Sequence, residues 1–400
     1  MANTNPFSFY SPVQIIYGKG AVSQLGDIPL PGTKAVIVTA NDGSMDAYAE
    51  RVQKILAGRG VEALIYAEVQ TNPTEEQIDR GAAFMVENGC DLIIALGGGS
   101  SIDCSKGMAV VVKNGGHCWD YAISGTGGKK PITEGAVPII SIPTTSGTGS
   151  EVSCVAVVSN EKTHEKMVFL SPAIFSRIAI LDPELTYTVP KGLTAFQGFD
   201  AFTHALEGYL HRKNNALTDL YACKAIELVV ENLPRTLEDG INEEARANMA
   251  LASNLAGIVL AQVGSVSMHP IEHAMSAYYP HLPHGCGLAV IFEEYYRALV
   301  KKGSVNGRLI ELAKVMGEEI TGETEEEQAM AFVRAGVSLL KNCGIYDMDL
   351  TRFGMTDLTD ADIEAMVEQV WTTSGTFANA DAWQFSREDV KGIYERSLLK

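Results

Sequence analysis

The first half of this 400-residue chain alternates short apolar runs with amphipathic segments, and this alternation constrains the fold most strongly. The apolar runs are rich in β-branched residues, whereas the segments between them repeat their apolar positions with helical spacing. Because parallel strands need crossover helices, the pattern predicts a parallel sheet flanked by helices on both faces. We expect strands at 35–40, 63–69, 91–98, 138–145, 151–159 and 177–182, and helices at 45–57, 75–88 and about 101–113.

The alternation ends near Asp182-Pro183, and the rest of the chain shows helical periodicity with little strand signal. The sequence therefore predicts two domains, an α/β domain at 1–187 and an all-helical domain at 188–400. The helices of the second domain are expected at 194–212, 215–231, 243–262, 268–278, 287–301, 306–316, 325–342, 360–371 and 387–397.

Composition narrows the choice of partners and compartment. A formal net charge of −18 argues against nucleic acid or an anionic membrane as a partner, because polyanions would be repelled. The seven cysteines form no CxxC pair and no regular framework, which is typical of reduced thiols. The N-terminus lacks the features of a signal peptide, and no apolar run approaches the roughly 18 residues of a membrane span. We therefore expect a soluble, cytoplasmic protein.

Two glycine-containing loops follow predicted strands. In GGGSSID, at 97–103, the glycines allow close backbone approach and the following helix N-terminus offers free N–H groups, which suits a phosphate. Its spacing is not that of the GxGxxG fingerprint. PTTSGTGSE, at 143–151, combines hydroxyl side chains with glycines and could wrap a phosphate and a carboxamide. A purely structural role stays open for each loop, but open α/β sheets bind ligands at this edge, so together they predict a dinucleotide site.

Histidines gather in one stretch of the helical half, MHPIEHAMSAYYPHLPHG, at 268–285. This stretch contains four of the eight histidines in the chain: His269, His273, His281 and His284. Upstream, Asp200 and His204 stand four residues apart on a predicted helix, so both project from one face. Carboxylate and imidazole ligands suit iron(II) or zinc. We predict a divalent metal site closed by the two segments, although spacing alone does not decide which imidazoles bind.

Four motifs in this order closely resemble the iron-containing (group III) alcohol dehydrogenases: GGGSSIDCSK, PTTSGTGSEV, GFDAFTHALEGY and HPIEHAMSAYYPHLPHG. The resemblance covers nearly the whole chain. It implies a dehydroquinate-synthase-like fold, with a dinucleotide-binding α/β domain, a helical metal-binding domain and an active site in the cleft between them. The implied reaction is hydride transfer between NAD or NADP and a small primary alcohol or diol, or the reverse reduction of an aldehyde. The resemblance also implies a homodimer or larger homo-oligomer.

The resemblance assigns roles to individual residues. The metal, Fe2+, Zn2+ or another divalent ion, would be held by Asp200, His204, His269 and His284. His273 would line the site as the catalytic proton relay, since imidazole titrates near neutrality, and His281 would be incidental. The cofactor would be bound by Asn72, Gly98, Gly99, Ser100, Asp103, Thr144, Thr145, Gly147, Thr148 and Lys166.

One departure from the family pattern concerns the choice of cofactor. Members strict for NAD often carry an aspartate right after the first strand, in a Val-Thr-Asp pattern, where this chain has Val38-Thr39-Ala40. Without a carboxylate to repel a 2′-phosphate, we expect NADP(H) to be accepted. Asp42, two residues later, is an alternative source of that carboxylate.

Other interpretations explain less of the sequence. A dehydroquinate-synthase-like lyase would need basic residues near the histidines to hold an anionic substrate, and the helical half shows no such cluster. A glycerol-dehydrogenase-like enzyme of the same superfamily fits PTTSGTGSE and the Asp200/His204 pair less well. A metal-binding protein without catalysis would leave both loops unexplained. The sequence does not choose among alcohols, diols and aldehydes, nor among divalent metals.

Overall fold

The computed structural model describes residues 4–374, 377 and 379–399, which form two compact units. One unit spans Tyr10–Val189, and the other begins at Pro190 and includes the chain up to Phe9. The predicted α/β domain at 1–187 includes the start of the chain, which the structure groups with the helical unit. Asn5 Nδ2 donates a hydrogen bond to Asn214 O at 3.1 Å, and the ring of Phe9 lies 6.0 Å from that of Tyr221.

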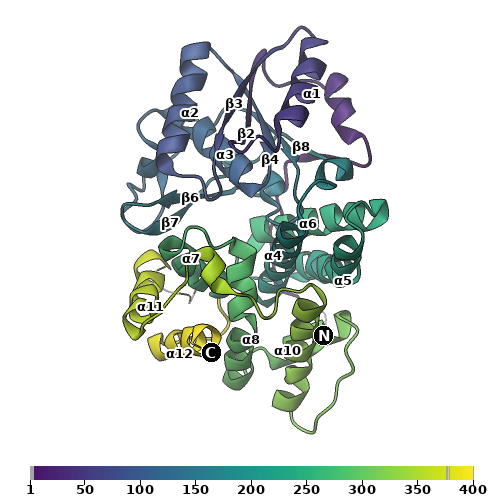
Figure 1. The fold of residues 1–400 in the computed structure, drawn as a ribbon, viewed down its shortest axis with the longest axis vertical. Helices are drawn as coiled ribbons and strands as arrows, with labels where there is room; N and C mark the ends of the chain where they lie inside the picture. The colour runs from purple at the N-terminus through teal and green to yellow at the C-terminus, as the bar shows by residue number, and fades with distance from the viewer. Residues whose placement is uncertain (1–3, 375–376, 378, 400) are drawn as a thin grey trace. The chain divides into compact units, whose positions relative to one another are not determined.

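The first unit is built on a parallel sheet, as predicted. Among the described residues this sheet has six strands in the order β1-β8-β5-β4-β2-β3. The strands are β1 (Gln14–Tyr17), β2 (Lys34–Ala40), β3 (Glu62–Val69), β4 (Leu92–Gly97), β5 (Ile139–Pro143) and β8 (Ile178–Leu181). Three helices pack against it (Figure 1): α1 (Asp46–Ala57), α2 (Glu75–Asn88) and α3 (Gly99–Asn114).

Strand β2 shows why the apolar runs of this half are unbroken. Val36 and Val38 belong to the buried cluster that contains α2 and α3, whereas Ala35 and Ile37 belong to the cluster that contains α1. Helices therefore cover both faces of the sheet. Since every side chain of such a strand is buried, its sequence need not alternate between polar and apolar residues.

Two further strands form a separate antiparallel ribbon, β6 (Val155–Asn160) and β7 (Glu165–Leu170). The sequence interpretation grouped a strand at 151–159 with the strands of the main sheet and missed β7. Strand β7 begins with Glu165 and Lys166, two charged residues typical of a surface loop. Their side chains are buried by tertiary packing, which the local pattern does not reveal.

Short 3-10 turns complete the description: Ala21–Gly26, Cys118–Tyr121, Ser150–Val152, Pro172–Ile174, Pro183–Thr186 and Leu350–Phe353. All seven cysteines lie in the described part of the chain, and each is free.

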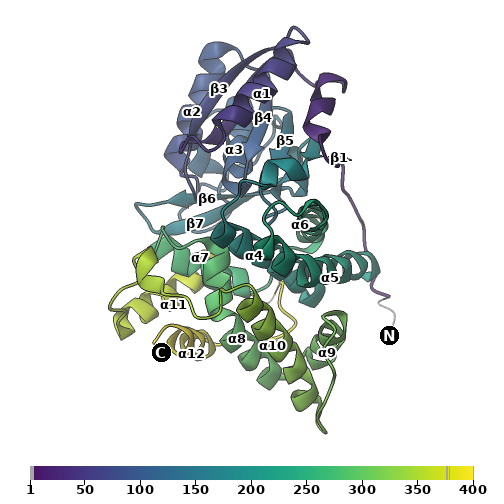
Figure 2. The ribbon, with the colours of Figure 1, turned by 45° about the vertical axis from the view of Figure 1, so that its right-hand side comes forward.

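The second unit is helical, as predicted, and Figure 2 labels its helices. They are α4 (Lys191–Leu210), α5 (Ala216–Glu238), α6 (Glu243–Val263), α7 (Met268–Tyr278), α8 (His284–Lys302), α9 (Asn306–Val315), α10 (Glu325–Asn342), α11 (Asp360–Ser374) and α12 (Arg387–Leu398).

Several helix boundaries differ from the predicted ones, and two of these differences have a clear physical cause. Helix α5 continues past residue 231 and through Pro234, because Leu233 and Leu237 are buried in the core and hold the last turns in place. Helix α8 begins at His284, three residues before the predicted start. Gly285 and Gly287 have low helix propensity and hide this first turn in the sequence.

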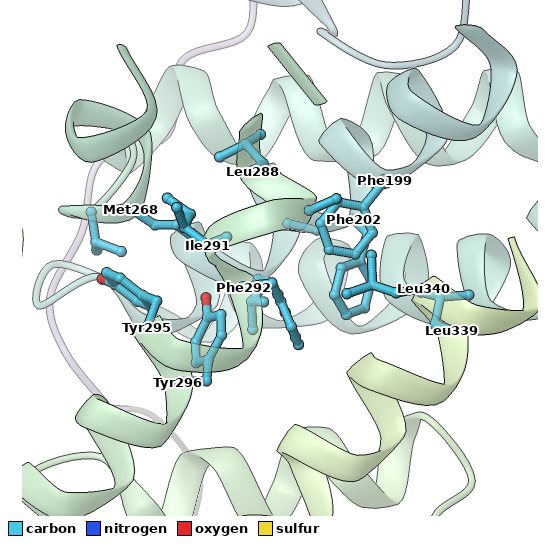
Figure 3. Close-up of a cluster of buried hydrophobic side chains, with 14 of the residues drawn as sticks. Phe199, Phe202, Met268, Leu288, Ile291, Phe292, Tyr295, Tyr296, Leu339 and Leu340 are labelled. Atoms are coloured by element: carbon cyan, nitrogen blue, oxygen red, sulfur yellow. The ribbon is translucent and has the colours of Figure 1, made fainter. Parts of the chain in front are cut away.

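The core of the helical unit is aromatic where α4 meets α8 (Figure 3). Phe199 and Phe202 of α4 stack with their centroids 5.6 Å apart, and Phe292 of α8 meets Phe199 edge-on at 5.5 Å. Met268, the first residue of α7, belongs to the same cluster. This packing fixes the rotation of the three helices about their axes, and therefore the direction of the polar side chains next to these residues.

No single helix among the described residues is long and apolar enough to span a bilayer. The pair α6 and α7 passes that test by length and composition when taken together, with a bend of 104° between the two helices.

Candidate metal centre and cofactor loops

Helix α4 carries three polar side chains on one buried face. Asp200, His204 and Glu207 follow one another at spacings of four and three residues, so they lie on the same side of the helix. Their exposed fractions are 2%, 6% and 0%. Polar groups buried to this degree need partners, which α7 and α8 provide.

Asp200 is the point on which the histidines converge. Its Oδ1 lies 3.5–3.6 Å from one ring nitrogen of each of three histidines, namely His204 Nδ1, His269 Nε2 and His284 Nε2. The ligands of a tetrahedral metal site with bonds of roughly 2.0–2.2 Å stand about 3.3–3.6 Å apart. The spacing around Asp200 is therefore that of a ligand set.

Three of the four predicted ligands place their donor atoms within 4.8 Å of one another: Asp200, His269 and His284. His204 lies next to this triad, but it is not part of the group within 4.8 Å. Its ring stacks on that of His269, with 4.5 Å between the centroids. The two helical segments singled out in the sequence thus meet at Asp200, and His204 lies beside the triad.

Buried negative charge gives a second test of whether a cation fits here. Glu207 Oε1 pairs with His269 Nδ1 at 2.5 Å, and Glu272 pairs with His284 Nδ1. Asp200 Oδ1 and His269 Nε2 are buried and have no hydrogen-bond partner in the described part of the chain. Three buried carboxylates beside open ligand atoms would be unfavourable without a cation. The donor set therefore fits a divalent metal.

The pKa values of His269 and Asp200 reflect the same excess of buried negative charge. Burial lowers the pKa of His269, but Glu207 and Asp200 outweigh it and raise that pKa to about 10. Burial raises the pKa of Asp200, but the three histidines hold it well below its ordinary value. A divalent ion would take the place of the proton that His269 would otherwise bind.

His273 lies beside the triad. Its ring centroid is 6.1 Å from that of His269 and 5.3 Å from that of His284. Donor atoms of Glu272, His273 and His284 form a second group within 4.8 Å. His284 faces Glu272 through Nδ1 and Asp200 through Nε2, so a second ion would require it to lose both ring protons. We therefore interpret the cluster as one metal site with His273 at its edge.

The loops that follow β4 and β5 lie side by side at the carboxyl edge of the sheet. Gly97 and Pro143 are register partners, and Thr144 N donates to Gly97 O at 3.0 Å. A Cβ on Gly99 would stand 2.5 Å from Thr148 Cγ2, so only glycine permits this approach. Strand β4 follows β3 in the chain but pairs with β2, which creates the switch point where such sheets bind ligands.

The N-terminus of α3 adds further groups to this edge. Gly98 caps the helix without a side chain, so no side-chain acceptor competes with an anion for the first N–H groups. Asn72 N donates to Ser100 Oγ at 3.3 Å. Asn72 adopts a φ of 55°, a left-handed conformation that asparagine tolerates better than most residues. Gly98, Ser100 and Asn72 therefore lie close together at this edge of the sheet.

Asp103 instead faces a buried network. Its carboxylate accepts hydrogen bonds from Ser150 Oγ at 2.5 Å and Val157 N at 2.9 Å. Burial raises its pKa, while the charges of Lys106 and Lys166 act in the opposite direction. The buried Lys106 Nζ donates to Ser150 Oγ at 2.8 Å, Ser153 Oγ at 3.1 Å and Val155 O at 2.6 Å. This network ties α3 to the second loop.

The end of β2 bears on cofactor choice. Ala40 is the last residue of the strand and offers no polar side chain there. The carboxylate of Asp42 accepts hydrogen bonds from Ser44 Oγ at 2.5 Å and Ser44 N at 3.0 Å, and these bonds lower its pKa. Asp42 is therefore engaged in the local turn.

Two family models together match most of the chain. One, described as iron-containing alcohol dehydrogenase, matches residues 12–183, and one described as the C-terminal part of the Fe-containing alcohol dehydrogenase family matches 194–398. The chain belongs to the iron-containing alcohol dehydrogenase family.

Relatives within this family support the assignment over nearly full length. The 1,3-propanediol dehydrogenase of Klebsiella pneumoniae is 32% identical, over 93% of this chain and 94% of its own. The probable NADH-dependent butanol dehydrogenase 1 of Bacillus subtilis is 30% identical, over 98% and 99%. An archaeal halo-thermophilic alcohol dehydrogenase from a Red Sea brine pool has a TM-score of 0.91 at 32% identity, covering 98% of this chain and 99% of that one.

Two residues of this alcohol dehydrogenase site were missed from the sequence, Glu207 and Glu272. Each stands three residues after a histidine, Glu207 after His204 and Glu272 after His269, so helical spacing could have placed both on the metal-facing side. Their partners are on other helices, and the sequence does not show them. His281 is exposed in the turn between α7 and α8.

Proposed function

We propose that this protein acts as a metal-dependent alcohol dehydrogenase and aldehyde reductase, moving a hydride between NAD(P) and a small primary alcohol or diol. The observation that carries the proposal is the convergence of three histidine nitrogens on Asp200 Oδ1 at 3.5–3.6 Å. Relatives named for butanol and 1,3-propanediol support small alcohols and diols as the substrate class.

The metal ligands in this proposal are Asp200, His204, His269 and His284. The Nδ1 of His204, which lies 3.6 Å from Asp200 Oδ1, would supply the fourth ligand atom. When bound, Fe2+, Zn2+ or another divalent ion supplies a Lewis acid for the alcohol or carbonyl oxygen. Since this ligand set accepts several metals, availability chooses among them.

We assign proton transfer to His273. In alcohol oxidation a bound NAD(P) would accept the hydride from the alcohol carbon, and the hydroxyl proton would have to leave separately. A ring nitrogen of His273 accepts that proton, and returns it when an aldehyde is reduced. Its position 5.3 Å from the ring of His284, beside the triad and outside it, supports this role.

The proposed cofactor contacts lie on the two loops and their neighbours: Asn72, Gly98, Gly99, Ser100, Thr144, Thr145, Gly147, Thr148 and Lys166. Asp103 would contribute by holding the second loop through Ser150. The relative named as NADH-dependent supports NAD, and Ala40 supports acceptance of NADP as well, since it places no carboxylate against a 2′-phosphate.

Assembly and compartment are part of the proposal. Strand β1 is an edge strand whose Ile15 and Tyr17 side chains are exposed, and such an edge favours pairing in a homodimer or larger homo-oligomer. The free cysteines support a reducing, cytoplasmic setting.

Anaerobically purified protein tests the function directly. We expect NADH or NADPH to form when butanol or 1,3-propanediol is added, followed by its absorbance. A chelator should abolish this activity, and adding back Fe2+ or Zn2+ should restore it. If a panel of alcohols and aldehydes gives no turnover with any added metal, the proposed function is wrong.

A further inference from the structure

Glu272 is a fully buried carboxylate directed at one of the metal-site histidines. It is 0% exposed, and its Oε2 pairs with His284 Nδ1. Its Oε1 is also buried and has no hydrogen-bond partner among the described residues. Glu207 differs, because it bonds His269 through one oxygen and Val266 N at 2.7 Å through the other. Glu207 therefore also supports the loop before α7, whereas the hydrogen bonding of Glu272 is directed to His284.

Keeping such a carboxylate in the core needs a physical reason. An ionised carboxylate taken out of water destabilises the fold unless it is paired, and only one of the two Glu272 oxygens has a hydrogen-bond partner among the described residues. A neutral imidazole has one N–H nitrogen and one acceptor nitrogen. A carboxylate at Nδ1 of His284 selects the tautomer with the proton there, so the lone pair is left on Nε2, 3.5 Å from Asp200 Oδ1.

Gly287 of helix α8 leaves the space that the Glu272 side chain occupies. A Cβ on Gly287 would stand 2.7 Å from Glu272 Oε1 and 2.8 Å from its Cγ. Gly287 lies one turn into α8, at the helix end that carries partial positive charge and favours a nearby anion. The chain thus provides both the carboxylate and the space that it occupies.

We propose that Glu272 is a positioning residue that fixes His284 in the Nδ1–H tautomer and strengthens Nε2 as a metal ligand. The inference rests on the metal centre of the proposed function, but it does not depend on turnover. A carboxylate partner of a ligand histidine is typically worth 10–100-fold in metal affinity. Removing the charge of Glu272 should therefore weaken metal binding without removing any ligand.

The test uses the full-length protein, freed of metal and titrated with Zn2+ against a chromophoric chelator. Glu272→Gln keeps the shape and an acceptor oxygen but loses the charge, and we expect it to bind Zn2+ on the order of tenfold more weakly. Glu272→Asp keeps the charge on a shorter side chain and should recover part of the affinity. 15N NMR of the histidine rings in the metal-free protein should show mixed tautomers at His284 in Glu272→Gln and one tautomer in the parent.

Glu311→Gln is the matched control, because it removes a carboxylate that accepts a hydrogen bond from the Tyr209 hydroxyl instead of facing a histidine. It should leave zinc affinity unchanged, and the melting temperatures of the metal-free variants report on folding. If the parent binds zinc and Glu272→Gln matches it in affinity and tautomer, the role of Glu272 is wrong while the proposed function stands. If the parent binds no metal, the centre itself is wrong, and the inference fails with it.

Discussion

At the scale of single residues, the groups that face the two ring nitrogens of a histidine define its role. His269 and His284 both turn Nδ1 towards a buried glutamate and Nε2 towards Asp200. His273 lies at the edge of this arrangement, and His281 is exposed. Residues of one type in one short stretch therefore divide into two triad members, a candidate relay and a bystander.

The division between ligand and relay predicts a contrast between two alanine variants. His269→Ala removes a ligand atom, so metal content should fall to a small fraction of that in the parent. His273→Ala should keep its metal but lose about 10²–10⁴-fold in kcat, the usual contribution of proton transfer. Elemental analysis and steady-state kinetics on the same preparations check this. Equal metal loss in both variants would contradict the assignment.

Ala40 predicts the response of cofactor choice to one added carboxylate. In Ala40→Asp, a negative charge at the end of β2 should repel the 2′-phosphate and bind the 2′-hydroxyl. The ratio of kcat/KM for NADPH to that for NADH should fall at least tenfold, or about 1.4 kcal/mol. Ala40→Ser is the uncharged control. An unchanged kcat/KM ratio in Ala40→Asp would show that other residues recognise the 2′ position of the cofactor.

At the scale of elements, the first turn of α8 completes the centre because two glycines let it approach its neighbours. A Cβ on Gly285 would stand 1.9 Å from Phe196 O of α4. Since that atom is backbone, one helix would have to move. The same turn begins with His284, so close packing of α8 on α4 and the position of a ligand are linked.

Gly285→Ala should therefore affect stability and metal affinity together. We expect a loss of about 1–3 kcal/mol in the free energy of unfolding, as for other overpacked sites, and weaker zinc binding. Gly192→Ala is the control, because its helical position in α4 has no described heavy atom within 4 Å of an added Cβ. That variant should be neutral or more stable by up to about 1 kcal/mol. Urea unfolding and chelator competition measure the two effects.

At the scale of the whole molecule, buried charge links stability to pH. Asp381 accepts a hydrogen bond from Ser267 N at 2.9 Å, while its Oδ2 is buried with no hydrogen-bond partner in the described residues. Burial raises the pKa of Asp381 to about 7. The folded chain therefore binds this proton more tightly than the unfolded chain, whose aspartates titrate near about 3.9. The stability from this group is greatest in acid and is lost as pH rises from about 4 to about 7.

Asp381→Asn tests this sign. The amide keeps an acceptor for Ser267 N but has no charge to bury, so the variant should melt at a higher temperature than the parent at pH 8. The difference should shrink at pH 5, where the parent carboxyl is protonated in the folded state. Thermal unfolding of both proteins across this range measures it. A constant difference with pH would mean that Asp381 does not titrate as inferred.

The sequence by itself determined the class of each half, the order of most elements and the two segments that meet at Asp200. These properties depend on local periodicity: strand and helix repeats are set by which side chains are buried along one element. The spacing of Asp200 and His204 on one helix, and the glycines after β4, are local in the same sense, and they also carried the family resemblance.

Only the tertiary structure decided which side chains on other elements contact these residues. It joined Glu207 to His269 and Glu272 to His284, turned Asp103 towards Ser150, buried the charged start of β7 and began α8 at His284. The sequence could not supply these contacts, because each joins side chains on different elements. Its pattern reports which side of an element is buried and does not identify the partner that covers it.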